Sequence, residues 1–262
     1  NKGINHVSFT GSVATGRLVQ AAAAYNIVPV TLELGGKSPQ LFFEDANLES
    51  ALPFLVNAGI QNGGQTCSAS SRILVHRSRY EEVVDRMSKK YKELIVRPAI
   101  EDGALGPLIS KRQKSIVEDF ISKGQNLNLV AQGKIDGKAP EKGHYVAPHL
   151  FADVSDDHIL AKEEIFGPVQ VIMPFDTEEE AINIANGTDY GLVASIWTSD
   201  GARQMRLAKK LKSGQVFINN YGAGGGVELP FGGRGLSGHG REKGFEALFG
   251  FSTLKTVASY HQ

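Results

Sequence analysis

The sequence is poor in residues that cross-link small domains or bind metals. It holds one cysteine, Cys67, so no disulfide can form within the chain. Its 7 histidines are scattered, and no His-x-x-x-His or Cys-x-x-Cys spacing predicts a zinc site. No apolar run reaches the about 18 residues that indicate a membrane span. Lysine plus arginine and aspartate plus glutamate each number 28, so no net charge favours nucleic acid or a membrane surface.

Length and composition instead fit one large or two small globular domains. Of the 262 residues, 41% are hydrophobic and 21% are charged, which is ordinary for a folded water-soluble chain. The start lacks the charged-then-apolar pattern of a secretion signal. A single cysteine is compatible with a reducing compartment, so we expect a cytoplasmic protein.

Helix and strand patterns alternate along most of the chain. Cap signals at Ser78, Ser110, Thr177 and Ser199 each open a stretch with apolar residues at helical spacing, and glycines at 124, 187 and 214 would end the last three. Asp45 or Asn47 would cap a further helix over residues 48–59. Strands are predicted at residues 4–10, 29–34, 38–43, 71–76, 128–131, 144–150, 169–174, 192–198, 215–219 and 252–260. This alternation predicts an α/β fold with a mostly parallel sheet and flanking helices.

Cys67 lies among glycines and small residues. Gly63 and Gly64 precede it, and four of the five residues after it are Ser or Ala. Glycines let the backbone approach a ligand closely, and small neighbours leave a thiol reachable. A thiol is a nucleophile only as thiolate, and most free cysteines are small buried hydrophobes. From this residue alone, both interpretations stay open.

A strand–turn–helix pattern near the start could hold a phosphate. Residues 4–10 read as a strand, Gly11 to Gly16 as a turn and residues 17–24 as a helix. Backbone N–H groups and the helix dipole favour an anion at such a helix start. The spacing is neither the Gly-x-Gly-x-x-Gly dinucleotide fingerprint nor a P-loop, so an ordinary turn is also open.

Two glutamates have unusual neighbours. Glu33 ends a predicted strand directly before Gly35 and Gly36, and Glu164 stands two residues before Phe166. Most glutamates are only solvated surface charges. A carboxylate in a partly apolar cleft, however, has a raised pKa that suits a general base near neutral pH.

Five segments in order make the chain resemble the NAD(P)-dependent aldehyde dehydrogenase superfamily. They are residues 9–12 (F-T-G-S), 32–39 (L-E-L-G-G-K-S-P), 63–68 (G-G-Q-T-C-S), 163–168 (E-E-I-F-G-P) and 230–233 (P-F-G-G). The resemblance implies oxidation of a small-molecule aldehyde with NAD or NADP, through a thiohemiacetal and a thioester on a cysteine.

The resemblance also assigns roles to single residues. It implies that Cys67 is the nucleophile and Glu33 the general base. It implies cofactor contacts from Gly11, Ser12, Leu34, Glu164 and Phe166, with the first two on the pyrophosphate, Glu164 on the hydroxyls of the nicotinamide ribose and Phe166 beside its ring. Thr66, Ser68 and Phe231 would line the substrate pocket. No metal is expected.

The same resemblance divides the chain into parts. Residues 1–34 would be the C-terminal part of a Rossmann-like cofactor domain and residues 35–235 the catalytic domain. Residues 236–248 would return to the cofactor domain, and residues 249–262 would form an oligomerisation strand in a homodimer or homotetramer. Because the family builds its dinucleotide domain largely from sequence ahead of the first segment, we expect a fragment that lacks the N-terminal part and is itself inactive.

Two alternatives stay open. Acyl transfer to coenzyme A could replace hydrolysis, but family members of that type tend to lack the glutamate that Glu33 matches. A non-catalytic domain kept for assembly is the second alternative, and the intact pair Cys67 and Glu33 argues against it. NADH production from propanal with and without coenzyme A would separate these functions.

Overall fold

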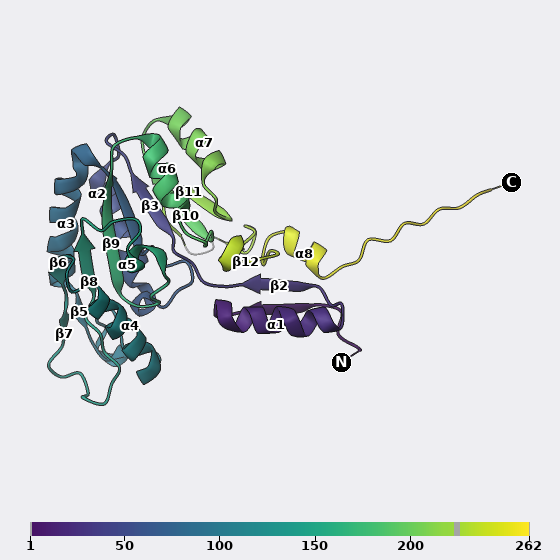
Figure 1. Ribbon diagram of the computed structural model, residues 1–262, viewed down its shortest axis with the longest axis horizontal. Helices are drawn as coiled ribbons and strands as arrows, with labels where there is room; N and C mark the ends of the chain where they lie inside the picture. The colour runs from purple at the N-terminus through teal and green to yellow at the C-terminus, as the bar shows by residue number, and fades with distance from the viewer. Residues whose placement is uncertain (1, 223–225, 262) are drawn as a thin grey trace.

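The computed structural model describes residues 2–222 and 226–261, and its strands form a sheet of seven, a sheet of three and a pair. The large sheet and its helices make the main body, and the three-stranded sheet lies to one side with the first helix (Figure 1). A glycine-rich stretch at residues 222–226 falls partly outside the described residues. None of the described helices is long and apolar enough to cross a membrane.

The seven-stranded sheet has the order β11-β10-β3-β4-β9-β8-β6. Every neighbouring pair is parallel except β6 and β8, which are antiparallel. The mostly parallel α/β fold is therefore confirmed. Its strands are β3 (Pro39–Phe42), β4 (Arg72–His76), β6 (Asn128–Gln132), β8 (His149–Ala152), β9 (Val169–Phe175), β10 (Val193–Trp197) and β11 (Gln215–Ile218).

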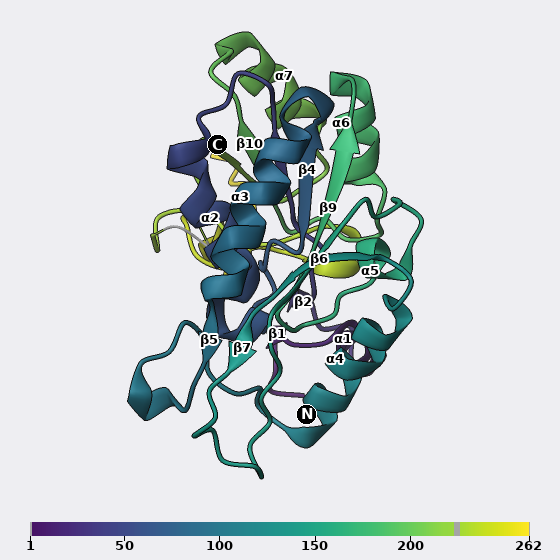
Figure 2. The same cartoon turned by 90° about the vertical axis from the view of Figure 1, so that its left-hand side faces the viewer.

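Successive side chains of this sheet face two separate cores. In β4, Ile73 and Val75 belong to one buried cluster and Leu74 to the other, because side chains alternate across a strand. Helices α2 (Leu48–Ile60) and α3 (Tyr80–Glu93) cover the first face, and Figure 2 shows them in front of the sheet. The second face is covered by α4 (Lys111–Lys123), α5 (Ile159–Lys162), α6 (Glu178–Asn186) and α7 (Gly201–Lys210).

The small sheet joins the first strands of the chain to a short strand near its C-terminal end. Strand β1 (Val7–Thr10) pairs in parallel with β2 (Val30–Glu33), and β12 (Gly238–His239) pairs antiparallel with β2. Helix α1 (Val13–Tyr25) packs on this sheet through Ala23 and the apolar side chains of β2. The segment predicted to return to the first part of the chain therefore does contact it.

Short elements complete the chain. These are the two-residue strands β5 (Ile95–Val96) and β7 (Lys134–Ile135), the 3-10 turns η1 (Gln61–Gly64), η2 (Arg77–Arg79), η3 (Ala99–Glu101) and η4 (Gly235–Ser237), and the helix α8 (Glu246–Gly250). Strands β5 and β7 pair in parallel, and the sequence pattern did not predict either of them.

Three predicted helix caps are confirmed. Asn47 caps α2, Ser110 caps α4 and Thr177 caps α6, each by accepting a hydrogen bond from the backbone N–H three residues on. Gly124 and Gly187 follow the last residues of α4 and α6, as predicted.

Two other predicted caps are wrong. Ser78 lies inside the turn η2, and α3 begins at Tyr80. Helix α7 is capped by Asp200 rather than Ser199, because the Asp200 carboxylate accepts from two backbone N–H groups of the first turn. That helix also ends at Lys210 and not at Gly214.

Two predicted strands differ from the structure. Of residues 144–150 only the last two belong to β8, because the carbonyls of His144 and Pro148 instead accept from Leu108 and Gly133 in loops. Residues 252–261 form no strand and run away from the body as an exposed extended segment (Figure 1). An oligomerisation strand there would have to form with another chain, so it stays a prediction.

Candidate active site

Cys67 lies in the loop that leads from η1 into β4. The chain reaches it through a sharp turn, in which Asn62, Gly63 and Gly64 have positive φ angles of 54°, 65° and 73°. At Gly64 a Cβ atom would lie 2.2 Å from the carbonyl oxygen of Gly167, so only glycine fits. The glycines before Cys67 therefore turn the chain directly onto the loop that holds the thiol.

The thiol of Cys67 is partly buried, and two carboxyl groups lie near enough to act on it electrostatically. Burial raises its pKa, as do the charges of Glu164 and Glu33, while the N–H of Ser68 lowers it. The residue also packs against a buried cluster that includes Leu192 and Tyr221. In this state the sulfur carries its proton at neutral pH, so a nucleophilic reaction needs a group that removes that proton.

Glu33 supplies a carboxyl group in an enclosed setting. Its side chain is 2% exposed, and neither carboxyl oxygen has a hydrogen-bond partner among the described residues. Burial raises its pKa to about 8, with a further increase from Glu242 and an opposing effect from Arg241. A Cβ atom at Gly232 would lie 2.7 Å from its Oε1 atom. Glu33 is thus held mainly as the neutral acid below about pH 8, against backbone that leaves little space.

Glu164 meets the glycines that follow Glu33. Its Oε1 atom accepts a 2.9 Å hydrogen bond from the N–H of Gly36. A Cβ atom at Gly35 would lie 2.2 Å from its Oε2 atom. Burial raises the pKa of Glu164, and the Gly36 N–H and Lys37 oppose that increase. The two glycines therefore form a cradle for this carboxylate.

Lys37 directly follows the two glycines of this cradle and is 2% exposed. Its Nζ atom has no hydrogen-bond partner among the described residues. Burial lowers its pKa to about 7, the charge of Arg72 adds to that effect, and Glu164 and Glu163 oppose it. A buried, unpaired amine next to Glu164 was not among the residues that the sequence pointed to.

The predicted phosphate turn lies at the end of the small sheet. The N–H of Gly11 donates a 3.0 Å hydrogen bond to the carbonyl oxygen of Glu33. Ser12 caps α1 and stays exposed at the start of the helix. Leu34 is buried, and its side chain contacts Gly16 closely enough to exclude a Cβ atom there. The turn and the general-base candidate are therefore directly joined.

Phe166 and Thr66 share a small cavity with Glu164. Its volume is about 10 Å³, near the size of one water molecule, and Gly36 also lines it. Phe166 has a positive φ of 55°, which is uncommon for a bulky residue, and its side chain is 36% exposed. The structure thus brings the cysteine segment and the Glu164 segment together.

Phe231 and Ser68, two residues predicted to line the substrate pocket, differ in their surroundings. Phe231 packs against the same buried cluster as Cys67, and its backbone exchanges hydrogen bonds of 2.6 and 2.7 Å with Glu242. Ser68 is 2% exposed. Substrate contacts from these two residues and from Thr66 remain predictions.

The sequence interpretation missed Glu242. Its charge raises the pKa of Glu33, and its Oε1 atom accepts from the hydroxyls of Ser8 at 3.2 Å and Thr10 at 3.5 Å. The available signal was a charged pair, Arg241 and Glu242, within a glycine-rich run. Only the pairing of β12 with β2 shows that this run reaches Glu33.

Two large cavities differ in their relation to Cys67. One of about 640 Å³ lies along α2 and is lined by Phe54, Asn57, Ala58 and Tyr221, of which the last two belong to the cluster against which Cys67 packs. The cavity therefore lies on the cluster beside Cys67, although Cys67 is not among the described residues that line it.

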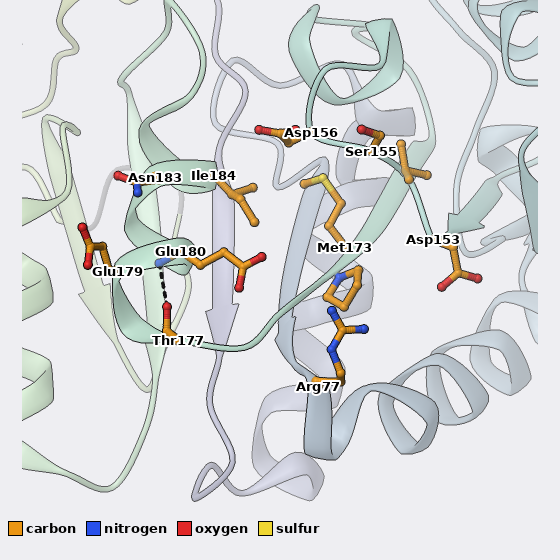
Figure 3. Close-up of a pocket in the computed structure, with 12 residues that line it drawn as sticks. Arg77, Asp153, Ser155, Asp156, Met173, Thr177, Glu179, Glu180, Asn183 and Ile184 are labelled. Carbon is orange, nitrogen blue, oxygen red and sulfur yellow. Dashed lines mark hydrogen bonds between the residues drawn. The ribbon is translucent and has the colours of Figure 1, made fainter.

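The other cavity, of about 650 Å³, is lined by β9, α6 and the segment after β8 (Figure 3). It contains Arg77, which follows β4, whereas Cys67 precedes β4. A strand of this length spans about 16 Å, so the second cavity lies at the far end of the sheet from the thiol. None of the predicted site residues lines it.

Comparison with known proteins gives consistent matches. Residues 1–257 match the aldehyde dehydrogenase family. The chain is 41% identical over 262 residues to betaine aldehyde dehydrogenase of Agrobacterium fabrum, covering 97% of this chain and 53% of that protein. The chain spans about half the length of the curated relatives it matches.

Solved structures agree with this match. A presumed aldehyde dehydrogenase from Burkholderia cenocepacia superposes with a TM-score of 0.96 at 60% identity, covering 98% of this chain and 54% of that chain. The NAD+ complex of aldehyde dehydrogenase from Bacillus cereus superposes with a TM-score of 0.92 at 42% identity, covering 98% of this chain and 52% of that chain.

Proposed function

Because the chain belongs to the aldehyde dehydrogenase family, we propose that it carries the catalytic centre of a protein that oxidises a small-molecule aldehyde to a carboxylic acid with NAD⁺ or NADP⁺. The observation that carries the proposal is the meeting of three groups: Glu33 and Glu164 lie near enough to the Cys67 thiol to act on it electrostatically, and Gly36, in the motif of Glu33, lies against the Cys67 carbonyl and donates to Glu164. The three groups come from three different motifs, and their chemistry is that of a nucleophile, a base and a binder of hydroxyl groups.

The residues present fit a nicotinamide dinucleotide at both its phosphate and its ribose. The start of α1 offers a helix dipole, the N–H groups of its first turn and the Ser12 hydroxyl to a phosphate, and Gly11 would approach the phosphate without a side chain, because its own N–H is bonded to Glu33. Glu164 can accept from ribose hydroxyls, and the cradle of Gly35 leaves no side chain over its Oε2 atom. When bound, NAD(P)⁺ supplies the acceptor for the hydride that leaves the substrate carbon.

Cys67 acts first in the proposed sequence. Its sulfur bonds to the aldehyde carbon, the carbonyl oxygen becomes an oxyanion, and the thiol proton passes to a base. The N–H of Cys67 can stabilise the oxyanion. The carbonyl of Thr66 accepts from the N–H of Ala69 at 2.8 Å, and a planar trans peptide then points the Cys67 N–H in the opposite direction.

Glu33 acts after hydride loss has left a thioester on Cys67. Its carboxylate takes a proton from a water molecule, the water oxygen bonds to the thioester carbon, and the carboxylic acid leaves while Cys67 regains its thiol. A pKa of about 8 makes Glu33 a stronger base than an ordinary carboxylate once it is ionised.

The tail supports a homo-oligomer as part of the proposal. Leu254, Val257 and Tyr260 are 100%, 83% and 87% exposed. An extended segment with exposed apolar side chains is stabilised when it pairs with a sheet edge of a second copy. Light scattering of the protein with and without the residues after Gly250 tests this, and an unchanged mass would contradict it.

We also propose a cytoplasmic location, because Cys67 must stay reduced.

The test of the function is Cys67→Ser in the full-length protein, with NADH formation from propanal as the measurement. We expect a loss of roughly a thousandfold or more, because a hydroxyl is a far weaker nucleophile at neutral pH. Activity within about tenfold of wild type would contradict the nucleophilic role. Addition of coenzyme A should not be required for turnover, whereas dependence on it would favour acyl transfer instead of hydrolysis.

A further inference from the structure

Two buried side chains hold the loop of Cys67 by its backbone carbonyls. The hydroxyl of Tyr221, which follows β11, donates to the carbonyl oxygen of Ser68. The side-chain amide of Gln170, in β9, donates to the carbonyl oxygen of Ser70. In the sheet, β9 neighbours β4 on one side, and β11 lies beyond β3 and β10 on the other. Side chains from both sides of β4 therefore hydrogen-bond to the loop that precedes this strand.

Gln170 cannot easily rotate away from this contact. Its side chain is fully buried, and its Oε1 atom accepts from the hydroxyl of Tyr91. Its Nε2 atom also donates to the carbonyl of Leu55 at 3.0 Å. Helix α2 packs directly on the amide, because a Cβ atom at Gly59 would lie 2.1 Å from the Gln170 Cδ atom. Every polar atom of this side chain is thus engaged.

Tyr221 is fixed by packing and by its hydroxyl, which also lies near the hydroxyls of Ser38 and Ser70. It is 9% exposed, and its ring belongs to a buried cluster with Ala58, Leu192 and Val193, against which Cys67 also packs. A buried tyrosine normally finds a partner for its hydroxyl. Here that partner is the backbone carbonyl of Ser68, the residue that follows the nucleophile.

Further contacts restrain the backbone of the loop. The N–H of Ser70 donates to the carbonyl of Ala58 at 2.9 Å. A Cβ atom at Gly36 would lie 2.4 Å from the carbonyl oxygen of Cys67, so the loop rests on glycine backbone there. With the Thr66 carbonyl bound within the loop, the carbonyls at residues 66, 68 and 70 all have partners.

We propose that Tyr221 is a positioning residue for Cys67, and that Gln170 secures the other end of the same loop. Through the Ser68 carbonyl, Tyr221 keeps the Cys67 thiol directed at the substrate carbonyl carbon and the Cys67 N–H directed at the carbonyl oxygen. Shifts of about 1 Å at a reacting group can cost on the order of a hundredfold in rate. The catalytic half of this inference rests on the proposed function, but the loop restraint can be tested without it.

The direct test is Tyr221→Phe, which removes only the hydroxyl. Because Cys67 is the one cysteine, its alkylation by iodoacetamide can be followed by mass on the chain as it stands. The titratable groups that act on the Cys67 thiol are Glu33 and Glu164, with Tyr221 itself beside them, and both carboxylates remain in the variant. We expect alkylation at about pH 8 to rise by roughly threefold or more, with an apparent pKa closer to that of an exposed thiol, because a loosened loop exposes the sulfur.

In the full-length protein the same variant should lose activity while the thiol becomes more reactive. We expect kcat to fall by about tenfold or more, with the KM values for aldehyde and NAD⁺ within roughly twofold of wild type. Opposite changes in alkylation and turnover distinguish positioning from general damage to the fold.

The matched control is Tyr80→Phe. Tyr80 is 5% exposed, and its hydroxyl donates to the backbone carbonyl of Ile172 at 3.3 Å and accepts from the N–H of Asp153 at 2.7 Å, so it bonds to no residue of the Cys67 loop. Its loss should lower stability without changing alkylation. Gln170→Met is a second variant, which keeps the length of the side chain and removes both donors. Amide hydrogen exchange at Ala69 and Ser70 should speed up in both site variants.

The inference is overturned if Tyr221→Phe and Gln170→Met both match Tyr80→Phe in the alkylation profile and in amide exchange of the loop. If Tyr221→Phe does not fold, Gln170→Met and its amide exchange decide the matter. Failure of the proposed function would appear separately, as activity retained by Cys67→Ser.

Discussion

The peptide N–H of Gly36 donates a 2.9 Å hydrogen bond to Oε1 of Glu164, across 128 residues of sequence. This contact joins the motif that contains Glu33 to the motif that contains Phe166. Because Gly36 also lies against the carbonyl of Cys67, the same dipeptide of glycines touches the proposed ribose binder and the nucleophile. Both glycines are therefore required for close approach of backbone to functional groups.

Gly35→Ala should weaken cofactor binding. Its new methyl group would lie 2.2 Å from Oε2 of Glu164, so the carboxylate must move. In the full-length protein we expect the KM for NAD⁺ to rise by about tenfold or more, which corresponds to about 1.4 kcal/mol. Gly137→Ala is the control, because nothing lies within 4 Å of the position of its Cβ atom. A KM unchanged within experimental error would show that Glu164 does not hold the cofactor.

Glu33→Gln should stabilise the chain more as the pH rises. The folded pKa of Glu33 is about 8, above its value of about 4.3 in an unfolded chain, so the folded state binds the proton more tightly. The favourable contribution of the neutral acid is complete below about pH 4 and is lost as the pH rises through 8. Glutamine does not titrate, so the stability advantage of the variant should grow by roughly 2–4 kcal/mol between about pH 5 and pH 8.

Urea unfolding followed by circular dichroism at a series of pH values measures this trend. Glu141→Gln, a change at an exposed glutamate, is the control. A difference between Glu33→Gln and wild type that stays constant with pH would mean that Glu33 is an ordinary ionised carboxylate in the folded chain.

Lys37→Met should show the opposite dependence on pH. Burial lowers the pKa of Lys37 to about 7, below its value of about 10.4 in an unfolded chain. Below pH 7 the folded chain carries the full cost of the buried charge, and that cost shrinks as the pH rises toward 10. The free energy of unfolding of the variant should therefore exceed that of wild type most at about pH 6. This advantage should be roughly 2 kcal/mol smaller at about pH 9.

The single tryptophan, Trp197, is buried in β10, so its fluorescence reports unfolding of the sheet next to Lys37. Lys89→Met is the control, because Lys89 is exposed on α3 and pairs with Asp85. A destabilised Lys37→Met variant at pH 6 would indicate that the amine has a stabilising partner.

Local sequence signals predicted much of the fold and little of the geometry of the site. Apolar runs identified β4 and β9, and the side chains of Ser110 and Thr177 identified two helix starts, since these features depend on residues a few positions apart. The prediction of Ser199 as a cap was wrong, because the neighbouring Asp200 carboxylate accepts from two N–H groups of the first turn.

The remaining features depend on contacts distant in sequence. The effect of Glu242 on Glu33, and the hydrogen bond from Tyr221 to the Ser68 carbonyl, arise only when the return segment and β11 reach the start of the chain and the cysteine loop. The residue types at the motif positions predict which groups react, and that assignment stays a proposal. How those groups are held follows from tertiary packing, which no spacing in the sequence specifies.

The central claim, a thioester on Cys67 that Glu33 hydrolyses, is tested most directly by trapping that intermediate. Full-length Glu33→Gln is mixed with propanal and NAD⁺ at alkaline pH, where Cys67 can ionise without Glu33, and NADH and the mass of the Cys67 peptide are followed together. The account predicts about one NADH per site, an acyl adduct on Cys67, and later turnover slowed by roughly a hundredfold or more. Turnover equal to wild type, or no NADH and no adduct, would contradict it.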